Sequence, residues 1–288
     1  MRLNELIGKM SDANRGSVIP TGITSLDNLI GGLSRGQVCT VAGRPIMGAT
    51  AFAVTVVRNI AVLGDVPTAY LTLDGGEEMI ADRLIRARGS RTVDLRKTMP
   101  DVQLPEAVGR LEQIGFELED SRLQEEAYRR RLCEAPIWIE NVLGMKYDDI
   151  LSRIEQLQQE HDVRVVVIDK LAWIIHAMDR GERQMVVMRL QQLAEKLNIV
   201  VLLLAGLSQR TERRFGCYPL LSDLRGGTGA DLFSSVVLLL YRPEYYCIDC
   251  DDRGETAGMV DVIVAKNSYG PLGTVRLDFR TRTCFEDL

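Results

Sequence analysis

The chain has 288 residues, of which 46% are hydrophobic and 26% are charged, as expected for one large α/β domain with a well-buried core. No apolar run approaches the roughly 18 residues of a membrane span, and Arg2 and Glu5 stand where a signal peptide would be apolar. We therefore expect a soluble, cytoplasmic protein without a membrane partner. The net charge of −5 excludes a surface coated for nucleic-acid binding but not a local basic loop.

Residues 2–10 carry their apolar side chains on one helical face, which predicts a short amphipathic helix. These side chains are Leu3, Leu6, Ile7 and Met10. The polar residues that follow predict a flexible connector, so the helix needs a surface to dock on, in its own domain or in a neighbouring subunit. We accordingly divide the chain into a helix and connector, residues 1–17, and one main domain, residues 18–288.

A phosphate-binding loop is indicated between two apolar runs, Gln37–Ala42 and Ala51–Val57, in the order strand, loop, helix. Its residues are Gly43, Arg44, Pro45, Ile46, Met47, Gly48, Ala49 and Thr50. In such loops glycines let backbone N–H groups point at the phosphates, a lysine reaches the β and γ groups, and a hydroxyl holds magnesium. Ala49 stands at the lysine position. The loop thus keeps the cradle and the hydroxyl but loses the cation. An ordinary glycine-rich turn is the alternative.

The rest of the chain alternates predicted strands and helices, which is typical of a parallel α/β sheet with helices on both faces. The predicted strands are Thr68–Leu73, Ile137–Ile139, Val163–Ile168, Ile199–Leu204, Val236–Tyr241, Met259–Ala265 and Gly273–Phe279. The predicted helices are Glu77–Arg88, Tyr147–Glu160 and further helices within residues 92–132. Because Val163–Ile168 is almost entirely apolar, we expect it to be central and buried on both faces.

Asp169 ends this central strand, where an acidic residue can accept from a magnesium-bound water in phosphate-loop nucleotide hydrolases. A structural aspartate that caps the next turn is the alternative. Lys170 follows directly and places a cation beside the expected nucleotide pocket. It either replaces part of the missing lysine charge or neutralises Asp169.

A basic loop with one aromatic residue, Gln209–Gly216, follows the strand Ile199–Leu204. Its arginines, Arg210, Arg213 and Arg214, are candidates for contacts to the phosphates of single-stranded DNA. A solvated arginine cluster is an equally open interpretation.

The six cysteines are scattered along the chain, several in or beside apolar runs, so we expect no disulfide framework. Cys247 and Cys250 have the spacing of half a zinc site. No second pair stands at zinc-ribbon spacing, and His161 and His176 lie far upstream. We interpret Cys247 and Cys250 as surface-loop cysteines.

Six blocks of this sequence resemble, in order, the C-terminal RecA-like motor domain of DnaB-type replicative helicases. The blocks are Ile19–Gly22, Gly43–Pro45 with Met47–Gly48, Val167–Asp169, Ser222–Arg225, Tyr241–Tyr246, and Ala265–Lys266 with Gly270–Pro271. The resemblance implies a RecA-like phosphate-loop fold, magnesium and ATP bound by residues 43–51 with Asp169 and Lys170, and a ring of subunits around single-stranded DNA. It also implies that residues 2–10 are the remnant of a linker helix that docks on the adjacent subunit, with the family's N-terminal helical domain absent.

The departures from the family fall on positions that resemble its chemical residues. Asp74 stands in place of the catalytic glutamate and is a vestigial candidate for that role. Its side chain is one methylene shorter, whereas proton abstraction needs a heavy-atom distance of about 2.6–3.2 Å between the carboxylate and the attacking water. Gly206 replaces the polar residue that senses the γ-phosphate. Lys266 and Ser268 lie where residues act on the neighbour's site, and Ser268 replaces the arginine that reaches into it. Glu77 and Glu78 are alternative bases, poorly fixed because two glycines precede them.

These substitutions leave three hypotheses open. The first is a non-catalytic DnaB-like protein that keeps the fold, binds ATP weakly and acts through assembly. The second is an active ATP-dependent helicase in which Lys170, Lys266 or a partner subunit supplies the missing charge. The third is an interaction module that regulates a full-length DnaB-type helicase by entering its ring. An engineered Ala49 is less favoured than natural decay, because several other chemical positions differ as well.

Overall fold

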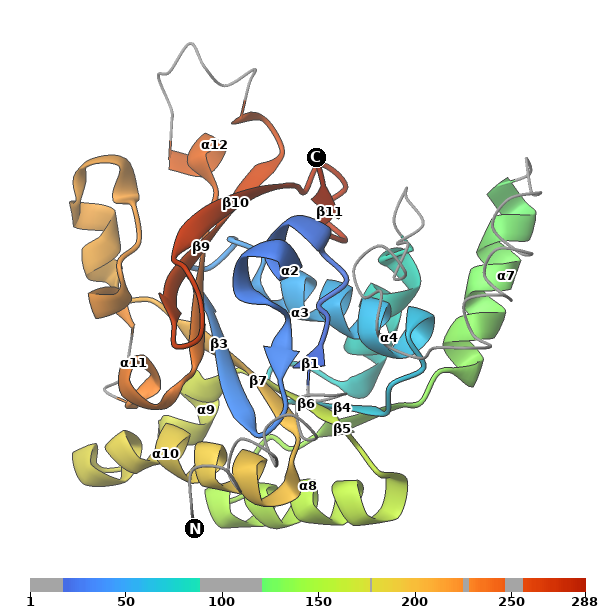
Figure 1. The fold of residues 1–288 in the computed structure, drawn as a ribbon, viewed down its shortest axis with the longest axis horizontal. Helices are drawn as coiled ribbons and strands as arrows, with labels where there is room; N and C mark the ends of the chain where they lie inside the picture. Colours follow the sequence, from blue (N-terminus) through green and yellow to red (C-terminus); the bar gives the residue numbers. More distant parts are fainter. Residues whose placement is uncertain (1–17, 89–120, 177, 225–227, 247–255) are drawn as a thin grey trace, which may run out of the picture.

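The computed structural model describes residues 18–88, 121–176, 178–224, 228–246 and 256–288 (Figure 1). The predicted amphipathic helix and connector, most of residues 92–132, and Cys247 with Cys250 lie outside the described residues.

Nine strands form one mixed sheet in the order β11-β10-β9-β8-β3-β7-β6-β4-β5. The parallel strands are β3 (Gln37–Gly43), β4 (Thr68–Thr72), β5 (Ile137–Asn141), β6 (Val165–Asp169), β7 (Val200–Gly206) and β8 (Val236–Tyr241). The antiparallel edge contains β9 (Met259–Asn267), β10 (Gly273–Asp278) and β11 (Glu286–Asp287). A separate hairpin pairs β1 (Val18–Ile19) with β2 (Leu33–Ser34). All seven predicted strands are present, with boundaries shifted by one or two residues in most of them.

Helices cover both faces of the sheet (Figure 1). Those on the side of the first core are α2 (Thr24–Ile30), α3 (Ala49–Val57), the π-helix η1 (Arg58–Leu63), α4 (Glu77–Arg86) and α7 (Ser121–Glu134). Those on the side of the second core are α8 (Tyr147–His161), α9 (Leu171–Ile175) and α10 (Arg180–Leu197). Short helical turns follow at η2 (Gln209–Arg213), η3 (Phe215–Cys217), η4 (Leu221–Asp223), α11 (Ala230–Phe233) and α12 (Pro243–Tyr246).

The alternation of side chains along β3, in the middle of the sheet, explains why helices cover both faces. Cys39 and Val41 of β3 face the core that contains α3, whereas Val38 and Ala42 face the core that contains α8 and α10. Successive side chains of a strand point to opposite faces, so an all-apolar strand must be covered on both. The nearly all-apolar β6 is buried at every position, as the sequence predicts.

The strand register gathers the predicted site residues at one edge of the sheet. Gly43 at the end of β3 pairs with Gly206 at the end of β7, and Thr72 of β4 pairs with Asp169 of β6. Since these strands are parallel, the loop after β3, the Asp74 segment and Lys170 all leave the sheet at its carboxyl edge. This is where ligands bind in open α/β sheets.

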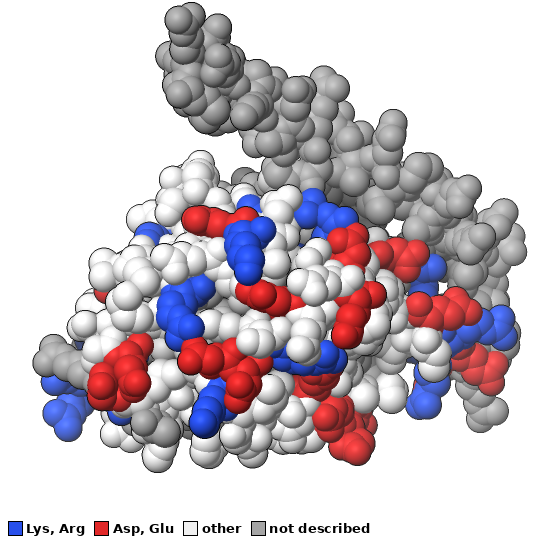
Figure 2. Space-filling view, turned by 90° about the horizontal axis from the view of Figure 1, so that it is seen from below, with Lys and Arg blue, Asp and Glu red and all other residues white. Residues whose placement is uncertain are grey.

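On the underside of the molecule, acidic and basic side chains are interspersed and form no continuous basic surface (Figure 2). None of the helices within the described residues is long and apolar enough to cross a membrane.

Candidate functional site

The loop after β3 keeps the backbone shape of a phosphate cradle. Gly48 has φ 96° and forms the N-cap of α3 without a side-chain cap. A Cβ at this position would lie 3.0 Å from Phe285 and 3.2 Å from Phe279, so only glycine fits. The first N–H groups of a helix lack intrahelical partners and favour an anion. The amino end of α3 is therefore available for phosphate.

Three aromatic rings support this loop from below. Phe52 of α3 packs edge-on against Phe285 at 5.4 Å, and Phe279 stacks on Phe285 at 4.3 Å between ring centroids. All three side chains are buried, and the Phe52 N–H donates to the Gly48 carbonyl at 2.8 Å. Packing of the core, rather than a bound ligand, thus fixes the glycine turn.

A buried arginine that sequence reasoning missed also holds the loop. Arg242 donates from Nη1 to the Ile46 carbonyl at 3.1 Å and forms an ion pair with Glu244. Its guanidinium lies 5.6 Å from the Phe279 ring centroid. The only signal in the sequence is the block Tyr241–Tyr246, which does not reveal what its arginine contacts. Arg242 therefore positions the backbone of the loop.

The basic side chain of the loop, Arg44, is directed away from the phosphate cradle. Arg44 donates to Glu212 at 2.9 Å and to the Leu207 carbonyl at 3.1 Å, both beyond the end of β7. Its side chain is only 11% exposed. Ala49, the first residue of α3, offers no charge in its place. The cradle thus contains polar backbone without a lysine.

Asp169 lies behind the loop and is completely buried. Tyr70, a buried residue of β4, donates its hydroxyl to Oδ2 of Asp169 at 2.7 Å, whereas Oδ1 has no hydrogen-bond partner among the described residues. Burial raises the pKa of Asp169, and the neighbouring Tyr70 and Thr50 hydroxyls and Lys170 lower it in part. The Thr50 hydroxyl acts here as a polar neighbour rather than a bonded partner, since no normal hydrogen bond reaches Oδ1.

An unpartnered carboxylate oxygen beside a threonine hydroxyl fits the ligand preference of magnesium, which takes oxygen ligands and keeps several waters. The metal role of Thr50 and Asp169 stays a prediction. No group of three or more candidate metal ligands occurs among the described residues, so any magnesium here would depend on nucleotide oxygens.

Lys170 forms an ion pair with Asp74, a partner that the sequence did not indicate. Both side chains are partly exposed, at 44% for Lys170 and 43% for Asp74. Lys170 also lowers the pKa of Asp169, but as a minor influence after burial. The carboxylate at the catalytic position is thus neutralised by the residue that was expected to supply charge to the nucleotide.

Of the two alternative bases, Glu77 is engaged away from the loop. Glu77 accepts from the backbone N–H of Asn141 at the end of β5, and this donor lowers the pKa of Glu77. Gly206 leaves open space at the end of β7, where an added Cβ would meet no atom within 4 Å. The end of β7 therefore has room for a side chain at Gly206 but carries none.

Lys266 and Ser268 lie apart from this pocket. Lys266 pairs with Val237 near the start of β8, and its Nζ donates to the Asp231 and Leu232 carbonyls at 3.0 and 2.7 Å. Burial lowers its pKa. The Ser268 N–H donates to the Ser235 carbonyl at 2.9 Å. Both residues therefore lie toward the amino end of β8, and any role in a nucleotide site would concern a neighbouring subunit.

The basic loop is divided into engaged and exposed arginines. Arg214 makes a two-pronged ion pair with the buried Asp223 at 2.7 and 3.1 Å, which lowers the pKa of Asp223. Arg210 and Arg213 are exposed, and Phe215 is fully exposed. The DNA-contact role of all three arginines stays a prediction. The structure favours Arg210 and Arg213 for it, because Arg214 anchors the loop.

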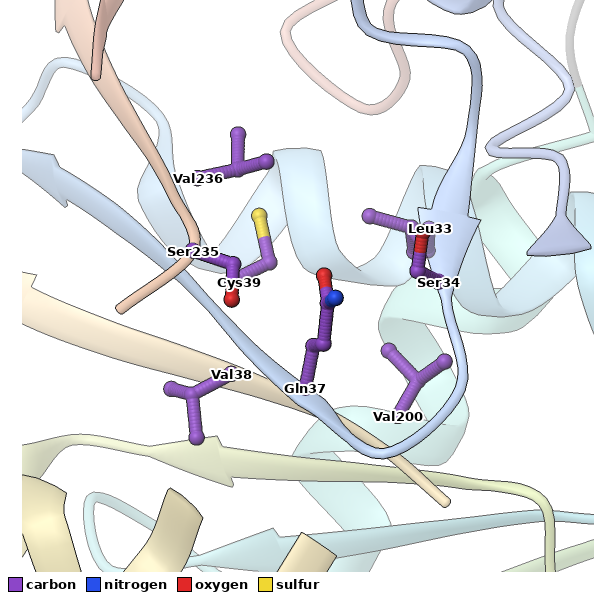
Figure 3. Close-up of a pocket in the computed structure, with 8 residues that line it drawn as sticks. All are labelled: Leu33, Ser34, Gln37, Val38, Cys39, Val200, Ser235 and Val236. Atoms are coloured by element: carbon purple, nitrogen blue, oxygen red, sulfur yellow. The ribbon is translucent and has the colours of Figure 1, made fainter. Parts of the chain in front are cut away.

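A small cavity lies at the opposite end of β3 from the loop (Figure 3). Ser34, Gln37 and Ser235 are among the residues that line it, and its surface is almost entirely apolar. Its volume of about 10 Å³ is near the lower limit for one water molecule, which excludes it as a nucleotide site.

Among the described residues, four cysteines are free thiols: Cys39, Cys133, Cys217 and Cys284.

Residues 18–287 match the family of DnaB-like helicase C-terminal domains. The chain belongs to this family. Among solved structures, one isolated ATPase domain is 27% identical with a TM-score of 0.77, over 99% of this chain and 97% of that chain. A DnaB-like replicative helicase, solved with its interactions with primase, is 26% identical with a TM-score of 0.75 and covers 100% of this chain and 67% of that chain. The RecA-like fold expected from the resemblance is thereby confirmed.

Curated relatives agree with this assignment. The replicative DNA helicase DnaC of Bacillus subtilis is 29% identical over 91% of this chain and 54% of the relative. The replicative DNA helicase DnaB of Leifsonia xyli subsp. xyli is 32% identical over the same shares. This DnaB-family chain thus spans about half the length of the curated relatives it matches.

Proposed function

We propose that this DnaB-family domain binds nucleotide weakly, does not turn it over at a helicase rate, and acts through ring assembly in DNA replication. The observation that carries the proposal is the Lys170–Asp74 ion pair beside a loop that has Ala49 in place of lysine. Ala49 removes the positive charge that would contact the phosphates. The ion pair with Lys170 neutralises the carboxylate of Asp74, which stands at the catalytic position. The cytoplasm is the corresponding location.

General magnitudes support this proposal. A lost charge-assisted contact to phosphate weakens binding by roughly 1.5–3 kcal/mol. An absent arginine finger, here Ser268, typically lowers a hydrolysis rate by about 10³–10⁵. Weak binding therefore survives these losses while catalysis does not. The residues that would hold ATP are 43–51, with Thr50 and Asp169 toward magnesium, which supplies charge neutralisation of the phosphates when bound.

The test is a steady-state ATPase assay with and without single-stranded DNA, run beside calorimetric titration with Mg-ATP. We expect measurable weak binding and negligible turnover, with tighter binding in an Ala49→Lys variant. A turnover rate like that of an ordinary replicative helicase would contradict the proposal. Size measurement by light scattering, with and without nucleotide, tests the ring.

A second candidate is an active ATP-dependent helicase with compensating residues. Its support is that Thr50 and the unpartnered Oδ1 of Asp169 still suit magnesium. Lys170→Ala separates the two functions, because it should abolish activity only if Lys170 supplies charge to the nucleotide. In the non-catalytic domain the same change frees Asp74 and produces no loss of turnover.

The partners are proposals of the same kind. Single-stranded DNA is expected to meet Arg210 and Arg213, so their replacement by alanine should weaken binding and flatten its salt dependence. Arg86→Ala is a suitable control, because that arginine pairs with Asp82 on the surface of α4. A full-length DnaB-type helicase is a further candidate partner, and co-purification of the two proteins would identify a regulatory role.

A further inference from the structure

Three basic side chains are tied to the loop or to the strand ends beside it, and each pairs with a carboxylate. Arg44 pairs with Glu212, Lys170 with Asp74, and Arg242 with Glu244. An ion pair offers a phosphate much less than a free cation does, because binding the phosphate must first break or share the existing pair. The charge of these three side chains is thus already committed within the chain.

The groups that hold the inner phosphates are nevertheless in place. The turn at Gly48 exposes the amino end of α3, whose nine residues begin directly after the loop. In phosphate loops the backbone N–H groups cradle the α- and β-phosphates. Oδ1 of the completely buried Asp169 has no hydrogen-bond partner among the described residues, and the Thr50 hydroxyl is one of the groups that lower the pKa of this carboxyl. A diphosphate group therefore finds most of its usual contacts.

The position of a third phosphate lacks its contacts. The lysine that normally reaches the terminal phosphate is Ala49, and Gly206 leaves open space where a polar side chain would meet it. Two carboxylates, Asp74 and Asp169, lie at the ends of the adjacent strands. Asp74 is already paired with Lys170, so a third phosphate would add its negative charge beside Asp169 and would lose water without gaining a new donor.

We infer that this site prefers a nucleoside diphosphate to the corresponding triphosphate, the reverse of what an intact phosphate loop with its lysine favours. The inference rests on the proposed function, since it concerns the same pocket. With this preference the domain would stay bound to the product of hydrolysis, ADP, and would bind ATP less readily. A ring subunit of this kind would remain in one nucleotide state while its neighbours cycle.

The test is a calorimetric titration of the full chain with ADP and with the non-hydrolysable triphosphate AMP-PNP, at equal free Mg²⁺. We expect ADP to bind at least about fivefold more tightly, as judged by the dissociation constants. Equal or tighter binding of AMP-PNP would overturn the inference and leave weak nucleotide binding intact. Binding of neither ligand would overturn both the inference and the nucleotide-binding part of the proposed function.

A matched pair of lysine variants assigns the preference to the loop. Ala49→Lys should tighten AMP-PNP binding by about tenfold or more and ADP binding by less, because a lysine there reaches the β and γ groups. Met185→Lys adds the same charge on α10, at a position that is already 44% exposed, and should leave the ratio unchanged. An equal gain for both ligands in Ala49→Lys would contradict the assignment to the terminal phosphate. A folding check by circular dichroism accompanies both variants.

Discussion

The support beneath the phosphate loop and the polar groups at its open side are held in different ways. Phe52, Phe279 and Phe285 are buried and interlocked under Gly48, and Tyr70 holds Asp169 in the interior. On the open side, Lys170 and Asp74 are more than 40% exposed and contact each other. The buried residues are required for folding, whereas the exposed residues would be required only for nucleotide chemistry.

Under the proposed function, this difference explains how a chain keeps the shape of a nucleotide site while its reactive groups change. Losing a buried aromatic costs several kcal/mol of stability, so the loop geometry persists as long as the domain folds. Surface ion pairs contribute about 0–1 kcal/mol, so the residues at the open side change at little cost to folding. Shape at this site is therefore weak evidence for catalysis.

The largest effect should come from removing the buried support. Phe52→Ala is expected to lower the free energy of unfolding by about 3–5 kcal/mol, because a fully buried ring is lost and a cavity remains. Phe215→Ala removes the same side chain from a fully exposed position and should change stability by less than about 0.5 kcal/mol. Urea denaturation measures both. Similar losses in the two variants would remove the distinction between interior and exposed sides.

The sequence predicts the buried half well and the exposed half poorly. Apolar runs with turn residues between them locate β3, α3 and β6, and the octapeptide locates the glycine turn. The Lys170–Asp74 pair joins the ends of two strands that are 96 residues apart, so its formation depends on sheet order and side-chain direction. Tyr70 reads as one more apolar strand residue, because nothing nearby in the sequence marks its acceptor.

Asp27 is a buried carboxylate away from the loop, and the dependence of stability on pH tests how its burial affects the fold. Asp27 accepts from the Thr21 N–H and hydroxyl and from the Gly22 N–H, and burial is the main cause that raises its pKa to about 6. A raised pKa in the folded state stabilises the fold below the unfolded pKa, and this stability is lost as pH rises through the folded pKa.

Asp27→Asn cannot titrate and should therefore gain stability relative to the native chain as pH rises from about 4 to 7. The expected gain is on the order of 2–3 kcal/mol, since one pKa unit corresponds to 1.36 kcal/mol. Urea midpoints at several pH values measure it. Asp82→Asn, at an exposed ion pair, serves as the control and should show no such trend. A flat difference for Asp27→Asn would exclude Asp27 as a titrating group.

The next effect compares two buried tyrosine hydroxyls. Tyr70→Phe should lower the free energy of unfolding by about 1.5–3 kcal/mol, because it leaves the buried carboxylate of Asp169 without its donor. Tyr147→Phe removes a buried hydroxyl that donates to the Val186 carbonyl at 2.6 Å, and should cost about 0.5–1.5 kcal/mol. Thermal and urea unfolding measure both variants. Equal losses would show that the Asp169 charge adds nothing to the bond.

The smallest effect concerns the ion pair that holds Arg44 away from the cradle. Glu212→Gln removes the charged partner of Arg44, a cation that belongs to the loop but is directed away from the cradle. Because a partly exposed ion pair is worth about 1 kcal/mol or less, the released arginine should tighten ADP binding by about two- to fivefold without lowering stability measurably. Asp278→Asn removes the same charge from the exposed pair with Arg280 and should leave ADP binding unchanged. An unaltered dissociation constant in Glu212→Gln would mean that the Leu207 carbonyl alone is enough to keep Arg44 away from the phosphates, and the exposed side would then be as firmly fixed as the buried one.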